Sequence, residues 1–196
     1  MTTDGVRLAR VEDAPRLAEL HCTRISEGFL ASLGPRFLAR LYRRVVRSRD
    51  AFAVVVERDD AVVGFCAAAS DVRRFYLEFL VRDGVFAALS APLQIVRATP
   101  RVVETLRYPA ATGDLPHAEV LAVATDAGVA GQGLGGALVR AATDRLQTRG
   151  CPEVKVVLGA TNERAQRMYA RGGFVRRADI TIHEGVHSEV LVWTRS

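Results

Sequence analysis

The chain has 196 residues, of which 49% are hydrophobic, and its formal net charge is +5 at pH 7. This length suits one well-packed domain, so we expect a single domain over residues 1–196. The longest apolar run, Ala61–Ala69, is under half of the roughly 20 residues that a membrane-spanning helix needs, so we expect no membrane segment. Residues 1–11 carry charges and no apolar block, which is not typical of a secretory signal, so we expect a cytoplasmic protein.

The cysteines and the basic residues exclude further kinds of site. Cys22, Cys66 and Cys151 are widely spaced, without CxxC or Cys/His ligand spacing, so we expect neither a disulfide framework nor a metal. Basic residues form no run longer than a pair, whereas a nucleic-acid surface needs a denser stripe with aromatic residues between. We therefore expect no nucleic-acid partner.

The N-terminal half predicts a short strand, two helices, a hairpin and an apolar insertion. The first four elements are expected at Val6–Ala9, Pro15–His21 (with Asp13 as N-cap), Arg36–Ser48, and the strand pair Ala51–Glu57 and Ala61–Ala69 around an Arg58-Asp59-Asp60 turn. The stretch Asp71–Pro116 has apolar residues in mostly helical patterns, interrupted by Gly84, Pro92 and Pro100. It is too apolar for a linker, which predicts a helical insertion or a lid.

The C-terminal half alternates strands and helices without a boundary. We expect strands at Ala118–Thr125 and Glu153–Leu158, helices at Leu134–Arg149 and Asn162–Arg171, and a terminal antiparallel pair at Phe174–Ile182 and Ser188–Thr194. This order predicts one α/β domain with a mixed sheet.

A glycine cluster, Gly131-Gln132-Gly133-Leu134-Gly135-Gly136, leads directly into the third predicted helix. It fits the GxGxxG pattern, but a dinucleotide fingerprint follows the first strand and has an acidic residue ending the next one, and both are missing here. The amides of such a cluster, with the helix dipole behind them, can bind one anion. Close helix–sheet packing is the alternative explanation, and we favour phosphate binding.

The segment His183-Glu184-Gly185-Val186-His187 matches HExxH formally. That motif binds zinc only on a helix, where the two imidazoles share a face. Here it lies between two strand-like runs with Gly185 at the turn, so we expect turn histidines and no metal site.

The glycine cluster and the segment from Asn162 to Phe174 together resemble the GNAT superfamily of acyl-CoA N-acyltransferases. The family's pyrophosphate loop, [Arg/Gln]-x-x-Gly-x-[Gly/Ala], is matched by Ala130-Gly131-Gln132-Gly133-Leu134-Gly135. Its later block, Asn-x-x-Ala-x-x-[Leu/Met/Phe]-Tyr-x-x-x-Gly-Phe, is matched at Asn162, Ala165, Met168, Tyr169, Gly173 and Phe174. One departure is Ala130, which stands where the family prefers Arg or Gln, so phosphate contacts must come from backbone amides or from an arginine elsewhere.

The resemblance implies an α/β fold with a mixed, mostly antiparallel sheet of six or seven strands flanked by helices. The helical insertion at about residues 71–116 would lie between two of these strands. It also implies acetyl-CoA as co-substrate, without a metal. The pantetheine arm would lie along Leu121, Ala122 and Val123, and the pyrophosphate would lie on the amides of the glycine cluster.

The resemblance further implies an N-acetyltransferase that acts by direct transfer on the primary amine of a small molecule. Tyr169 would supply the proton for the leaving thiolate, and Asn162 would bond the CoA arm while it caps its own helix. The general base would be Glu119 or His117, which share a strand face, and Glu119 ranks slightly ahead. A non-catalytic acyl-CoA sensor and a protein N-terminal acetyltransferase are the alternatives, the acceptor is not identified, and a homodimer is left open.

Overall fold

The computed structural model describes residues 5–25, 30, 33–90, 115–182 and 186–195, of which 84–90, 182 and 186 are described by their backbone alone. Its strands are β1 Val6–Leu8, β2 Ala51–Arg58, β3 Ala61–Ala69, β4 Glu119–Thr125, β5 Glu153–Gly159, β6 Val175–Ile182 and β7 Val186–Thr194. Its helices are α1 Ala14–Arg24, α3 Gly34–Arg47, α4 Val72–Ser90, α6 Leu134–Thr148 and α7 Glu163–Arg171, with short 3-10 turns at Val11–Asp13 and Ala127–Val129.

The seven strands form one sheet in the order β1-β2-β3-β4-β5-β7-β6. Every neighbouring pair is antiparallel except β4 and β5, which run parallel. The predicted fold class is therefore confirmed, with seven strands. The position of β7 between β5 and β6 does not follow from chain order.

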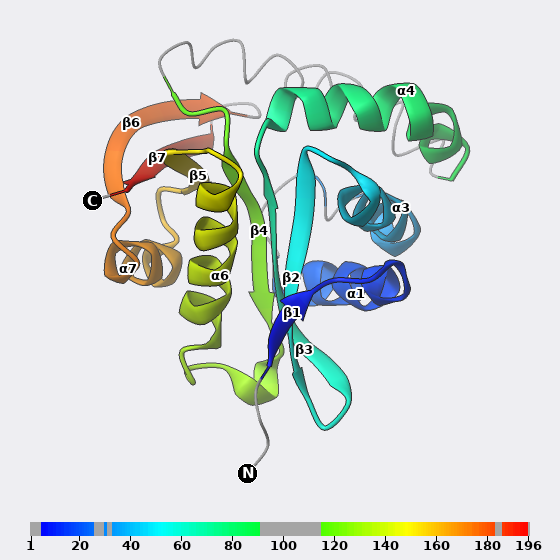
Figure 1. Cartoon of the computed structure of the whole chain (residues 1–196), viewed down its shortest axis with the longest axis horizontal. Coiled ribbons are helices and arrows are strands. Elements are labelled where there is room, and N and C mark those ends of the chain that lie inside the picture. The colour runs from blue at the N-terminus through cyan, green and yellow to red at the C-terminus, as the bar shows by residue number, and fades with distance from the viewer. Residues whose placement is uncertain (1–4, 26–29, 31–32, 91–114, 183–185, 196) are drawn as a thin grey trace.

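Helices cover both faces of the sheet, and each face has its own core. Figure 1 shows α1 and α3 on one side of the central strands, α6 and α7 on the other, and α4 across the end of the strands. Alternate residues of β2 point into the two cores, Val55 toward α1 and α3 and Val54 toward α6 and α7. Because β2 and β3 are buried on both faces, their sequences read as almost continuous apolar runs.

The predicted turn of the first hairpin is confirmed in detail. Asp59 and Asp60 both have positive φ, 50° and 61°, between the last residue of β2 and the first of β3. Two successive positive values define the turn that matches the twist of a two-residue hairpin, and aspartate tolerates them.

Asp13 occupies the N-cap position of α1, as predicted, but its carboxylate does not cap the helix. It accepts a hydrogen bond from the Arg10 amide at 2.6 Å and forms an ion pair with Arg7 at 2.7 Å. Arg7 also pairs with Glu57 on β2. The carboxylate therefore helps to fasten β1 and the entry of α1 to the neighbouring strand.

The predicted insertion begins as a helix, since α4 starts at Val72, directly after β3. Its remainder, 91–114, and the central residues 183–185 of the HExxH segment lie outside the described residues. The antiparallel pair is present as expected, but His187 was expected in the turn and stands on β7 opposite Thr181 of β6, because β7 begins at Val186 rather than at Ser188. Among the described residues, no helix is long and apolar enough to cross a membrane.

Candidate active site

The parallel strands β4 and β5 are in contact only at their beginnings. They pair at Glu119–Lys155 and Val120–Val156, although β4 continues to Thr125. Beyond Val120, β4 keeps only its other neighbour, β3. The β5-facing backbone of residues 121–124, here named the open edge of β4, therefore presents hydrogen-bonding groups without a strand partner among the described residues.

A β-bulge at Leu121 contributes to this separation. Ala67 of β3 pairs with Ala122, whereas Ala68 pairs with Val120, so Leu121 is an extra residue on β4. A bulge bends its strand and increases the local twist. As a result both Leu121 and Ala122 contact the core under α1 and α3, whereas Val123 packs on the α6 side. Alternation alone would have placed Leu121 and Val123 on one face.

The glycine cluster lies after β4 and begins α6. Gly133 is the N-cap of this helix, with φ of 79°, and no side chain caps it. Among the described residues, no backbone or side-chain acceptor is bonded to the amides of residues 131–136. These amides are therefore free to donate to an anion at the positive end of α6.

The glycines of the cluster are required for different reasons. Gly131 and Gly133 have positive φ, 84° and 79°, which the turn into α6 needs. A Cβ at Gly135 would lie 2.9 Å from Sδ of Met168, so this glycine permits the close approach of α6 and α7. A Cβ at Gly136 would meet nothing within 4 Å, and its φ is not in the positive range. Neither backbone conformation nor packing therefore explains Gly136.

An arginine from another element stands beside this cluster. Ala130, which the sequence places where the family prefers Arg or Gln, is exposed and offers no polar side chain. From the end of β2, however, Nη1 of Arg58 donates a hydrogen bond of 2.9 Å to Oε1 of Gln132. Sequence reasoning did not identify Arg58, because the contact depends on the fold of the β2–β3 hairpin.

Asn162 and Tyr169 lie at the start and near the end of α7. The side chain of Asn162 caps the helix by accepting a hydrogen bond of 3.1 Å from the Ala165 amide, as predicted. Tyr169 is buried in the core between α6, α7 and the sheet, with its ring edge-on to Phe174 at 5.1 Å. Burial raises the pKa of the Tyr169 hydroxyl well above its ordinary value, and Cys66 and Glu119 add to that effect.

Glu119 is buried at the point where β4 and β5 separate. Its neighbours Ala118 and Val120 face the α6 core, so its carboxyl projects on the opposite face of the sheet. Oε2 lies 3.6 Å from Nζ of Lys155, which is an ion pair but is beyond hydrogen-bonding distance. Burial raises the pKa of Glu119 to about 7, and Lys155 opposes that rise.

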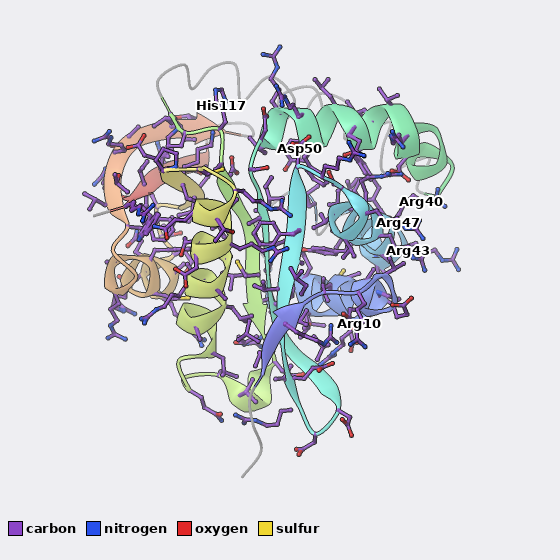
Figure 2. All side chains as sticks on the ribbon, viewed as in Figure 1. Arg10, Arg40, Arg43, Arg47, Asp50 and His117 are labelled. Atoms are coloured by element: carbon purple, nitrogen blue, oxygen red, sulfur yellow. The ribbon has the colours of Figure 1, made fainter. Side chains whose placement is uncertain are left out.

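His117 lies apart from this buried pair. It precedes β4, its side chain is exposed, and its carbonyl accepts a hydrogen bond of 3.1 Å from the Val72 amide of α4. Figure 2 shows it at the end of the sheet beside α4. The two-residue period that placed it on one face with Glu119 applies within a strand, and β4 begins only at Glu119.

A small cavity of about 20 Å³ lies between α1, α3, α4 and β4, which is room for about one water molecule. Its polar wall is a buried pair, with Nδ1 of His21 and the hydroxyl of Tyr42 2.6 Å apart. Burial lowers the pKa of His21 to about 4, so the imidazole is neutral at pH 7. The remaining lining is mostly apolar: Leu30, Leu41, Val45, Ala67, Phe75, Tyr76, Leu121 and Ala122.

A wider hollow of about 310 Å³ lies on β6 and β7 at the far end of the sheet. It is lined by Gly173, Val175, Arg176, Arg177, Val192 and Thr194. None of these residues belongs to the open edge of β4, the glycine cluster or the Glu119 region. The larger of the two hollows is therefore not the one beside the candidate active site.

Sequence reasoning missed Lys155, the His21–Tyr42 pair and Tyr76. Lys155 had a signal, because a charged residue within the apolar run Val154–Leu158 must be paired if that strand is central. The other three residues depend on how α1, α3 and α4 pack over β4, for which their sequences hold no motif.

Several solved structures have a fold similar to that of this chain. SsHAT has a TM-score of 0.70 at 18% identity, over 98% of both chains. The ribosomal-protein-S18-alanine N-acetyltransferase of Escherichia coli has a TM-score of 0.62 at 14% identity, over 100% of this chain and 95% of that one. AAC(6')-Ib, in complex with parmomycin and acetyl-CoA, has a TM-score of 0.63 at 17% identity, over 98% of this chain and 94% of that one.

These identities establish a shared fold. A comparison with curated protein sequences finds no match. The sequence profile described as the acetyltransferase (GNAT) family matches residues 15–174, which include the open edge, the glycine cluster and Tyr169. The chain therefore belongs to the acetyltransferase (GNAT) family.

Proposed function

We propose that this protein transfers an acetyl group from acetyl-CoA directly to the primary amine of a small molecule. The observation that carries the proposal is the open edge of β4, where pairing with β5 stops after Val120. The unpaired amides of residues 131–136 lie beyond one end of this edge, and Glu119 lies at the other. Tyr169 is the third element, because its hydroxyl is close enough to Glu119 for the two groups to interact electrostatically.

In this proposal acetyl-CoA binds as an added strand. Amides of its pantetheine arm bond to the backbone of Leu121, Ala122 and Val123, in the way that an extended peptide adds to a free sheet edge. Its pyrophosphate accepts hydrogen bonds from the amides of the glycine cluster at the start of α6. Asn162 already bonds the Ala165 amide, and its remaining side-chain hydrogens can reach the CoA arm.

The chemistry needs three proton transfers. The acceptor amine is an ammonium ion at neutral pH, and a base must remove one proton before nitrogen attacks the thioester carbon. The carbonyl becomes an oxyanion, which a backbone N–H near Val123 stabilises, and collapse breaks the C–S bond. Tyr169 then protonates the leaving sulfur, since its raised pKa keeps the hydroxyl protonated at neutral pH. The nitrogen, which is cationic after the attack, returns its second proton to the Tyr169 phenolate, so the products are the amide, free CoA and the one proton held by the base.

We assign the base to Glu119 in preference to His117. A base works best when its pKa is near the working pH, and burial brings the pKa of Glu119 to about 7. Glu119 lies on the cavity face of the sheet and Tyr169 lies on the α7 face. The two groups therefore approach the open edge from opposite faces, with the base on the face covered by α1 and α3. His117 is exposed and precedes the strand.

One feature of the structure supports a small acceptor. The cavity beside Leu121 and Ala122 is mostly apolar and has room for about one water molecule, so it offers no groove for a polypeptide. The structural relatives favour neither kind of acceptor, since AAC(6')-Ib was solved in complex with parmomycin and another relative is named as a ribosomal-protein-S18-alanine N-acetyltransferase. Protein N-terminal acetylation is therefore the competing function.

Release of free CoA thiol, measured with acetyl-CoA and a panel of amines and N-terminal peptides, tests the proposal. We expect thiol release with at least one small amine and an acetylated product 42 Da heavier, the mass of an acetyl group in place of hydrogen. Tight acetyl-CoA binding without release for any acceptor would contradict catalysis and indicate a sensor. Release with peptides alone would indicate an N-terminal acetyltransferase.

A further inference from the structure

Lys155 is the only lysine of the chain, and it is one of the most deeply buried residues. Only 1% of its surface is exposed, although lysine is almost never fully buried unless it is paired. Its neighbours Val154 and Val156 face the α6 and α7 core, so its side chain projects on the opposite face, the face of Glu119. The residue therefore points toward the acceptor side of the sheet.

The fold places Lys155 directly across from Glu119. Glu119–Lys155 and Val120–Val156 are the only paired positions of β4 and β5, and the strands separate immediately beyond them. Nζ of Lys155 lies 3.6 Å from Oε2 of Glu119, and the two side chains are 2% and 11% exposed. The pairing of β4 with β5 thus holds the ammonium group beside the carboxyl, at the point where the two strands separate.

A buried ion pair seldom adds to the stability of a fold. Removing two charges from water costs several kcal/mol per ion, and a well-packed apolar pair is often as stable or more stable. Oε2 of Glu119 makes no hydrogen bond with any described residue, and Nζ of Lys155 lies 3.6 Å from it. An apolar residue at 155 would also continue the Val-rich strand without interruption. The position of the pair beside the open edge therefore favours a role in the reaction.

We propose that Lys155 is a positioning residue of the acetyl-transfer site, whose ammonium group keeps a large fraction of the Glu119 carboxyl ionised at neutral pH and orients it toward the acceptor amine. The inference rests on the proposed function for its catalytic meaning. Lys155 itself contacts neither substrate. Its effect passes through Glu119, which takes the proton from the acceptor ammonium and becomes a neutral acid beside the lysine.

The other groups around Glu119 cannot replace this charge. Among the described residues, the titratable side chains coupled to its carboxyl are Lys155 of β5, Tyr76 of α4 and Tyr169 of α7. Burial raises the pKa of both tyrosine hydroxyls, so both are neutral at pH 7. Lys155 is the one cation in that set, and it lowers the Glu119 pKa against the larger opposite effect of burial. Without it the carboxyl would be mostly protonated at neutral pH and could not accept a proton.

The test measures the ionisation of Glu119 without any acceptor. Protein labelled with ¹³C at the glutamate carboxyl carbon is titrated by NMR, and the signal that Glu119→Gln removes is assigned to Glu119. We expect a pKa of about 7 in the wild type. In Lys155→Met, which keeps side-chain length without charge, the pKa should rise by about one unit or more. Lys155→Arg should keep most of the wild-type value. Val156→Ala, a buried change on the next residue, is the packing control and should leave the titration unmoved.

An unchanged or lower Glu119 pKa in Lys155→Met would overturn the proposal. If Lys155→Met and the milder Lys155→Gln do not fold, each is combined with Glu119→Gln. Recovery of folding would support the proposal, because the defect then came from burying the Glu119 carboxyl without the cation beside it. Failure to recover would overturn it in favour of a packing role. If no amine is acetylated by the wild type, the proposed function fails while the NMR result still stands, so the two failures are distinguishable.

Discussion

Nδ1 of His21 and the hydroxyl oxygen of Tyr42 lie 2.6 Å apart, buried between α1 and α3. Burial alone lowers the pKa of His21 from 6.5 to about 4, because no carboxylate among the described residues lies beside the imidazole to offset desolvation. The unfolded chain therefore binds more protons than the folded one between pH 4 and 6.5. This histidine stabilises the fold fully above pH 6.5, and its contribution of about 3 kcal/mol is lost as the pH falls toward 4.

Glu119 is expected to give the opposite dependence. Its pKa is raised from 4.5 to about 7, so the folded chain binds more protons than the unfolded one across that interval. Stability should therefore decrease as the pH rises from 4.5 to 7, again by about 3 kcal/mol. The two effects oppose each other, and the wild type should change little between pH 4.5 and 6.5.

Urea unfolding of wild type, His21→Gln and Glu119→Gln at several pH values separates these contributions. The free energy of unfolding of Glu119→Gln, minus that of the wild type, should grow as the pH rises from 4.5 to 7. The same difference for His21→Gln should shrink as the pH rises from 4 to 6.5. Three parallel curves would mean that neither group has the shifted pKa.

Alanine substitutions at two adjacent glycines of the cluster, Gly135 and Gly136, should change stability in opposite directions. Gly136→Ala adds a methyl group into open space on a helix, so the fold should be as stable or slightly more stable, by up to about 1 kcal/mol. If CoA phosphates lie on this backbone, the dissociation constant for CoA should rise about fivefold or more, roughly 1 kcal/mol. Gly135→Ala would force Met168 to move and should lower stability instead.

Thermal unfolding and calorimetric titration with CoA distinguish these variants. Gly128→Ala is the control, since its Cβ also meets nothing within 4 Å and it lies outside the cluster. Wild-type CoA affinity in Gly136→Ala would show that the glycine is not there to admit a phosphate.

Arg58 should supply part of the phosphate binding that Ala130 lacks. Its guanidinium is held beside the cluster by the hydrogen bond to Gln132, and it is exposed enough to turn toward an anion. Arg58→Ala should weaken CoA binding by about threefold to tenfold at low salt, and less at high salt, because exposed charges are screened. Arg36→Ala, which removes an exposed arginine of α3, is the charge-matched control. Equal effects of the two variants would assign the loss to net charge alone.

The order and type of the elements were predictable because their signals are local. Alternating or continuous apolar runs predicted the strands, and Asn162 predicted the start of α7 through its capping chemistry. The ends of most predicted elements differ from the observed ones by one or two residues. Helix α1 is the exception, since it continues to Arg24 rather than ending near His21.

Features that depend on pairing between distant segments were not predictable. The insertion of β7 between β5 and β6 and the bulge at Leu121 are set by strand register, which no single segment encodes. The partner of Lys155 could be named only once β4 and β5 were known to be parallel neighbours. His117 was a candidate because strand periodicity was extended two residues beyond the strand itself. The motif residues Gly131–Gly136, Asn162 and Tyr169, in contrast, are recognisable without the fold.

Tyr169→Phe provides the most direct test of the acetyl-transfer site. The hydroxyl makes no hydrogen bond with a described residue, so its loss should leave the fold and the dissociation constant for acetyl-CoA nearly unchanged. Loss of the proton donor should lower the turnover number for CoA release to a reactive amine by about 100-fold or more. The measurement is the rate of thiol release by wild type and variant at saturating acetyl-CoA. Full wild-type turnover in Tyr169→Phe would contradict the assignment of Tyr169 as the acid that completes acetyl transfer.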